Sequence, residues 1–164
     1  MNSPSDYRPC AAMLLFNPDG KVLIADRNDC NYPAWQLPQG GVESGESIEE
    51  SVFRELEEEI GTSAVKIISI ADKKICYDWP KKIKWKGQEN WLGQCVTLVA
   101  LIFIGNDKEI NVHTHSPEFR DWKWVPLETI PELTISFKKP LYDYAVERFT
   151  EIRDSYLLSE NNPS

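Results

Sequence analysis

Residues 40–61 read GGVESGESIEESVFRELEEEIG, a glycine-rich start followed by a strongly acidic segment. Ser47 is followed three residues later by Glu50, which is the spacing of a capping box at the first turn of a helix. Gly61 is placed as the residue that ends such a helix in a left-handed conformation. The stretch therefore predicts a tight turn that leads directly into a helix with a cap at each end.

Three glutamates of this helix, Glu55, Glu58 and Glu59, stand at positions i, i+3 and i+4 and share one face. A run of charge on a helix is usually a solvated face. The apolar residues, however, form a stripe whose edge includes Glu59: Ile48, Val52, Phe53, Leu56 and Ile60. We therefore expect Glu59 to be partly buried. Partly buried carboxylates that repel one another need a cation, and oxygen ligands suit Mg²⁺ or Mn²⁺.

The fixed positions Gly40, Glu46 and the run 54–61, RELEEEIG, resemble the Nudix box of the nucleoside-diphosphate-linked hydrolases. One position departs, because Thr62 stands where the family usually has an aliphatic residue. The resemblance implies an α/β fold, a Nudix-type α/β/α sandwich with a mixed β-sheet. It also implies that Arg54 pairs with Glu46 to brace the loop against the helix, and that the Gly40 carbonyl joins the three glutamates as a ligand of more than one metal ion.

Further segments narrow the resemblance to the bacterial RNA pyrophosphohydrolases, a subgroup that overlaps the asymmetric dinucleoside polyphosphate hydrolases. The similarity covers about residues 7–148 and includes YRP at 7–9, WQLPQGG at 35–41, YDWP at 77–80, GQ at 93–94, PEF at 117–119, WKWV at 122–125 and SFK at 136–138. The segment after Gly93 and Gln94 departs from the subgroup, which leaves the substrate contacts near that strand open.

The same resemblance implies the remaining site residues. Glu118 is expected to reach the metals from across the site, and the general base is either Glu118 or a glutamate of the box. Arg8 and Arg27 are expected to contact the 5′ phosphates or the first bases. Phe137 with Lys138 would form a corner for base stacking and phosphate binding, and Tyr77 is a further candidate.

The net charge is -8, yet six of the 18 basic residues lie in one stretch with three aromatic residues. A basic stretch of this kind can bind phosphates and stack bases. Within it, Lys82 is expected to bind the substrate. The alternative is a sheet edge that lysines protect from aggregation. The residues are Lys73, Lys74, Lys81, Lys82, Lys84 and Lys86, with Tyr77, Trp79 and Trp85.

Hydrophobic periodicity predicts the other elements. Strands are expected at 10–16, 21–25, 35–37, 64–71, 95–104 and 119–125, and a final helix at 140–157. The chain of 164 residues, 41% of them hydrophobic, fits one domain (1–164) with an ordered body at about 7–158. No apolar run resembles a signal peptide or a membrane span, so a soluble cytoplasmic protein is expected.

The four cysteines lack any C-x-x-C spacing, and we expect thiols rather than a disulfide or a zinc site. His113 and His115 are expected at the surface rather than on a metal. The resulting hypothesis is a metal-dependent pyrophosphohydrolase that removes pyrophosphate from 5′-triphosphorylated RNA and so promotes mRNA decay. The alternatives are an asymmetric diadenosine tetra- or pentaphosphate hydrolase that releases ATP and, less favoured, a non-catalytic nucleotide-binding module.

Overall fold

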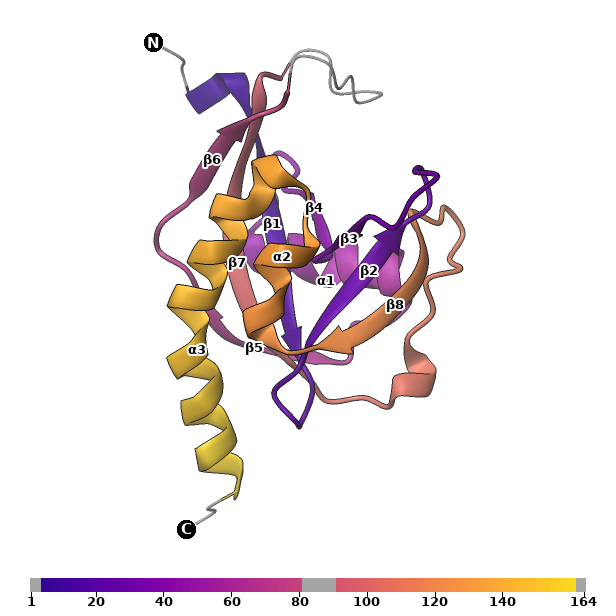
Figure 1. Cartoon of the computed structure of the whole chain (residues 1–164), viewed down its shortest axis with the longest axis vertical. Helices are drawn as coiled ribbons and strands as arrows, with labels where there is room; N and C mark the ends of the chain where they lie inside the picture. The colour runs from indigo at the N-terminus through magenta and orange to yellow at the C-terminus, as the bar shows by residue number, and fades with distance from the viewer. Residues whose placement is uncertain (1–3, 81–90, 162–164) are drawn as a thin grey trace.

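The computed structural model describes residues 4–80 and 91–161. A mixed eight-stranded β-sheet forms its centre, with α1 on one face and α2 and α3 on the other (Figure 1). This arrangement confirms the predicted α/β/α sandwich.

The strands are β1 (Tyr7–Phe16), β2 (Val22–Arg27), β3 (Trp35–Gln36), β4 (Gln39–Gly41), β5 (Val65–Ile70), β6 (Ile75–Asp78), β7 (Gly93–Phe103) and β8 (Phe119–Val125). The α-helices are α1 (Ile48–Ile60), α2 (Ile130–Leu133) and α3 (Lys139–Asn161). Short 3₁₀ helices cover Pro4–Asp6, Asp107–Glu109, Leu127–Thr129 and Ser136–Lys138. No helix in the described ranges is long and apolar enough to cross a membrane.

The two central strands, β1 and β7, run parallel from the pair Tyr7 and Gly93 to the pair Phe16 and Ile102. The order of the main path is β3-β2-β1-β7-β5, and β4, β6 and β8 pair antiparallel with β1, β7 and β2. Both central strands are covered on both faces, which explains their nearly continuous apolar sequences.

Alternate residues of β1 point into two separate cores. Leu14 belongs to the core under α3, where it lies with Leu141 and Phe149. Leu15 belongs to the core under α1, where it lies with Leu56. The period of two along the strand therefore divides the interior between the two helical layers.

Helix α1 begins and ends as predicted. The Glu50 N–H donates to Ser47 Oγ over 3.1 Å, and the Ser47 N–H donates to the Glu50 carboxylate over 3.3 Å. Gly61 has φ +75°, and a Cβ there would meet the Asn111 carbonyl oxygen at 2.9 Å. Phe53, at the edge of the apolar stripe, is 39% exposed.

Two strands were not predicted. The glycine-rich segment expected as a turn includes β4, which pairs with β1, and part of the basic stretch forms β6. The predicted strand at 95–104 begins two residues earlier, and its expected last residue, Ile104, lies beyond it and is exposed. The final helix begins at Lys139 and reaches Asn161.

The prediction of four thiols is wrong for two cysteines. Cys76 of β6 lies directly opposite Cys95 of β7, with the Cα atoms 4.0 Å apart, and the two form a disulfide. Their separation of 19 residues has no recognisable motif, and only the pairing of the two strands brings them together. Cys10 and Cys30 are free, and burial raises the pKa of the Cys10 thiol to about 11.

Candidate active site

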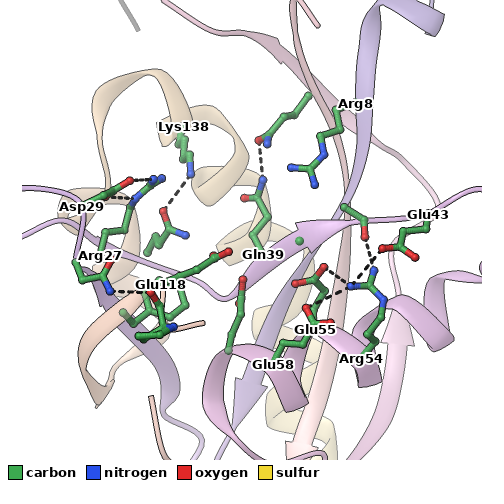
Figure 2. A pocket seen from close by; sticks show the side chains of 18 of the residues that line it. Arg8, Arg27, Asp29, Gln39, Glu43, Arg54, Glu55, Glu58, Glu118 and Lys138 are labelled. Atoms are coloured by element: carbon green, nitrogen blue, oxygen red, sulfur yellow. Dashed lines mark hydrogen bonds and ion pairs between the residues drawn. The ribbon is translucent and has the colours of Figure 1, made fainter. Parts of the chain in front are cut away.

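A cavity of about 580 Å³ opens between α1, β4, the end of β2 and the segment before β8. It brings together most of the predicted site residues from distant parts of the sequence. The lining includes Arg8, Arg27, Gly40, Arg54, Glu55, Glu58, Glu59, Glu118 and Lys138. Figure 2 shows Arg8 and Lys138 extending into this space from above, while Glu55, Glu58 and Arg54 rise from α1 below.

Glu59 is the most deeply buried carboxylate of the cavity, with 3% of its surface exposed. Its Oε2 atom has no hydrogen-bond partner among the described residues. Burial, together with the nearby charges of Glu118 and Glu55, raises the pKa of Glu59 well above its ordinary value. An ionised Glu59 therefore lacks the neutralising partner that a buried charge requires.

Glu55 and Glu58 extend the acidic side of the cavity in different environments. Burial raises the pKa of Glu55, although the hydrogen bond and charge of Arg54 oppose the shift. Glu58 is exposed, and its Oε2 atom lies 3.5 Å from Arg54 Nη1. The three glutamates thus combine one fully buried, one half-buried and one exposed carboxylate on the same helix.

Arg54 connects the glycine-rich loop to these carboxylates. Its Nε and Nη2 atoms donate to the two oxygens of Glu46 over 2.7 and 2.9 Å, and Nη2 also donates to the Gly41 carbonyl over 2.9 Å. Its Nη1 atom donates to Glu55 Oε1 over 2.7 Å. The hydrogen bonds from Arg54, joined by one from the Glu43 N–H, lower the pKa of Glu46 to about 2. The expected pairing of Arg54 with Glu46 is confirmed.

The donor set fits a divalent cation. Glu59 supplies a buried oxygen without a partner, and Glu55 and Glu58 add carboxylates on the same helix face. Strand β4 comes so close to this helix that a Cβ at Gly40 would lie 2.0 Å from Glu55 Cδ. Among the described residues, no three His, Cys, Asp or Glu side chains already converge as a finished metal site. Glu55 and Glu58 instead form ion pairs with Arg54.

The opposite side of the cavity is basic. Lys138 is only 6% exposed, and its Nζ atom donates to Gln36 Oε1 over 3.3 Å. Burial, reinforced by the charge of Arg27, lowers the pKa of Lys138 to about 8. Arg27 forms an ion pair with Asp29, and the guanidinium of Arg8 lies against Gly41.

A second cavity, of about 340 Å³, adjoins the first and shares Arg27, Asp29, Gln36 and Lys138 with it. Its other walls are largely apolar and include Trp35, Leu133 and Phe137. Phe137, whose ring is expected to stack on a base, lines this smaller cavity together with Lys138. A polar cavity with carboxylates and cations thus lies next to a largely apolar one.

One further predicted binding residue lies elsewhere. Tyr77 lines neither cavity; its ring lies 5.8 Å from that of Phe137, and its hydroxyl bonds to Gln94. Lys82 and most of the basic stretch lie outside the described residues. His113 and His115 are exposed.

Sequence reasoning missed several polar residues of the cavity. Gln39 Nε2 donates to Gln94 Oε1 over 2.6 Å, and both side chains line the larger cavity. Gln39 Oε1 is buried without a partner in the described part of the chain. The signal was present in the WQLPQGG and GQ segments, but nothing in them shows that the two glutamines meet across β1.

The family model described as the NUDIX domain matches residues 6–145. The chain belongs to the Nudix family. The Nudix box is the loop and helix that carry Glu46, Arg54 and the three cavity glutamates. Nudix hydrolases generally need divalent metal ions, which agrees with the donor set described above.

Curated Nudix relatives resemble nearly the whole chain. A protein from Zymomonas mobilis named RNA pyrophosphohydrolase is 40% identical over 148 residues, covering 88% of this chain and 96% of the relative. One of the same name from Sphingopyxis alaskensis is also 40% identical, covering 87% and 92%.

Solved Nudix structures confirm the fold. The MutT protein from Methanosarcina mazei superimposes with a TM-score of 0.63 at 20% identity, covering 91% of this chain and 99% of that one. An Ap4A hydrolase from C. elegans gives a TM-score of 0.56 at 17% identity, covering 84% and 96%.

Proposed function

We propose that this Nudix protein is a metal-dependent RNA pyrophosphohydrolase that converts the 5′-triphosphate end of RNA to a 5′-monophosphate. The observation that carries the proposal is the division of one cavity into a carboxylate side on α1 and a cationic side formed by Arg8, Arg27 and Lys138. The names of the relatives from Zymomonas and Sphingopyxis support the choice of RNA.

The cationic side suits a polyphosphate. A 5′-triphosphate carries several negative charges, and the guanidinium groups can bind its oxygens through paired hydrogen bonds. Lys138 is already buried, so its ammonium has lost most of its contact with water. A bound phosphate would supply an opposite charge beside this ammonium. These contacts place the triphosphate over the glutamates of α1.

The carboxylate side suits the hydrolytic step. Glu55, Glu58, Glu59 and the Gly40 carbonyl would hold divalent ions, with Glu118 approaching from the opposite wall. Such ions neutralise phosphate charge and lower the pKa of water that attacks phosphorus. Glu118 or a glutamate of the box accepts the proton of that water. Arg54 and Glu46 hold the loop and the helix in register and transfer no proton.

The smaller cavity suits a base. Phe137 offers a ring for stacking, and Trp35 and Leu133 complete a largely apolar enclosure. Because it opens beside Arg27 and Lys138, a nucleotide bound there would leave its phosphates in the larger cavity. The net charge of -8 disfavours long nucleic-acid contacts, so recognition is confined to the end of the RNA. We place this activity in mRNA decay in the cytoplasm, with Mg²⁺ or Mn²⁺ as the ion.

A second candidate is asymmetric hydrolysis of diadenosine tetra- or pentaphosphate. The same two cavities would accept an adenosine and a polyphosphate tail, and the fold of the C. elegans Ap4A hydrolase is similar. A non-catalytic module is disfavoured because all three glutamates of the box face the cavity.

Product analysis tests the proposal. The protein is incubated with a short 5′-triphosphorylated RNA and Mg²⁺, and the products are separated by chromatography. We expect a 5′-monophosphate RNA with release of pyrophosphate, no reaction in excess EDTA, and a rate lower by a factor on the order of 10² to 10⁵ for Glu58→Gln. Full turnover in EDTA, or by the variant, would contradict it.

A further inference from the structure

The loop that joins β2 to β3, residues 28–34, lines part of both cavities. Asn28 and Asp29 line the larger cavity, and Asp29, Cys30 and Tyr32 line the smaller one. The position of this loop therefore determines the shape of both cavities at the point where they meet.

One side chain of β8 holds this loop. Arg120 Nη1 donates to the Cys30 carbonyl and Nη2 to the Tyr32 carbonyl, each over 2.7 Å. Its Nε donates to Asp26 Oδ2 over 2.8 Å. Arg120 itself lines neither cavity.

Asp26 completes the arrangement from the end of β2. Its side chain is buried, and its other oxygen accepts the Ala34 N–H over 2.7 Å at the far end of the loop. Burial would raise the pKa of Asp26, but the hydrogen bonds from Arg120 and from the Ala34 N–H, with the charges of Arg120 and Lys123, together outweigh it and lower the pKa below the ordinary value. The carboxylate thus remains charged and ties both Arg120 and Ala34 to the strand.

We infer that Arg120 is a positioning residue that fixes the 28–34 loop, and through it Arg27, for substrate binding. The inference rests on the proposed function. Arg27 is tied to the loop twice: its N–H donates to the Ala34 carbonyl over 3.0 Å, and its guanidinium pairs with Asp29, next to Cys30. A loop released from Arg120 carries these groups away from the phosphate and base positions.

Arg120 should affect binding more than the chemical step. Glu55 and Glu58 of α1 are held by a separate network around Arg54, which shares no residue with the Arg120 network. Lysine cannot replace Arg120, because a single ammonium on a flexible stem cannot span a carboxylate and two carbonyls in one plane.

The test compares Arg120→Ala and Arg120→Lys with the wild type on a triphosphorylated dinucleotide RNA with Mg²⁺. The matched control is Arg153→Ala, which removes ion pairs to Glu128 and Asp154 away from both cavities. Melting temperatures are measured for all variants. We expect both Arg120 variants to raise KM about tenfold, with kcat within about twofold, whereas Arg153→Ala leaves KM unchanged.

The outcomes separate the two claims. Wild-type hydrolysis with an unchanged KM in both Arg120 variants would overturn the inference alone. A kcat that falls in proportion to lost folded protein, with KM constant, would also overturn it and leave a purely structural role. Failure of the wild type to hydrolyse the RNA would overturn the proposed function and this inference with it.

Discussion

Arg54 and Glu46 form a two-point ion pair, with Nε to Oε2 at 2.7 Å and Nη2 to Oε1 at 2.9 Å. The pair joins the loop before α1 to the helix itself. Because the same guanidinium contacts Glu55 and Glu58, the geometry of this pair is transmitted to two of the proposed metal ligands.

Replacing Glu46 with Gln is therefore expected to lower kcat about 10- to 100-fold by releasing Arg54. Glu43→Gln is the matched control, because Glu43 is exposed and its ion pair with Arg54 Nη1 is long, at 4.0 Å. Steady-state kinetics of both variants check the prediction. Equal losses in the two would show that the close pairing has no particular role.

Glu59→Gln should separate stability from metal binding. The amide removes a buried carboxylate that lacks a partner among the described residues, so the metal-free variant is expected to be at least as stable as the wild type. Saturating Mg²⁺, at about 100 times its Kd, should stabilise the wild type by about 2.7 kcal/mol and the variant much less. Thermal unfolding with EDTA and with Mg²⁺ measures both. An equal Mg²⁺ response would exclude Glu59 as a ligand.

Lys138 predicts a dependence of stability on pH. Its pKa falls from an ordinary value of 10.5 to about 8 in the folded state, so the unfolded chain binds more protons between these values. Stability should therefore rise with pH across that window, and the full cost of burying the cation is present below pH 8. Lys138→Met should raise the free energy of unfolding at pH 7 by about 1 to 3 kcal/mol, with little gain near pH 10, while raising KM.

Urea denaturation at the two pH values, together with kinetics, tests this prediction. Lys139→Met is the control, since Lys139 is the next residue and its side chain is 45% exposed. A loss of stability in Lys138→Met at pH 7 would show that the bond to Gln36 outweighs the cost of burial.

The Cys76–Cys95 disulfide predicts two titratable thiols in denatured, unreduced protein and four after reduction. Closing a loop of this length should contribute about 3 kcal/mol to stability, so Cys76→Ala should lower the free energy of unfolding by about that amount in non-reducing buffer. Cys30→Ala removes a free, partly exposed thiol and serves as the control. Four titratable thiols without reductant would contradict the disulfide.

Local patterns predicted much of the fold. The capping box at Ser47 and the C-cap at Gly61 depend only on neighbouring residues, so α1 could be placed within one residue. Strand β4 was missed because its three residues, Gln39–Gly41, form a strand only through pairing with β1. The disulfide was missed for the same reason, since its two cysteines meet only when β6 pairs with β7.

The residues of the candidate site likewise fall into those that local sequence could predict and those that it could not. The shared face of Glu55, Glu58 and Glu59 follows from their spacing along one segment, whereas the pairing of Arg54 with Glu46 was implied by the resemblance to a family. Arg120 could not be found, because its acceptors lie about 90 residues earlier and two of them are backbone carbonyls, which have no signature in side-chain identity. Resemblance to a family singled out Phe137 and Lys138, which line the smaller cavity and which periodicity alone could not have selected.

The choice of RNA as substrate is tested most directly by comparing kcat/KM, with Mg²⁺, for a short 5′-triphosphorylated RNA and for diadenosine tetraphosphate. We expect a clear preference for the RNA. A preference for the dinucleotide, or no hydrolysis of the RNA, would contradict it.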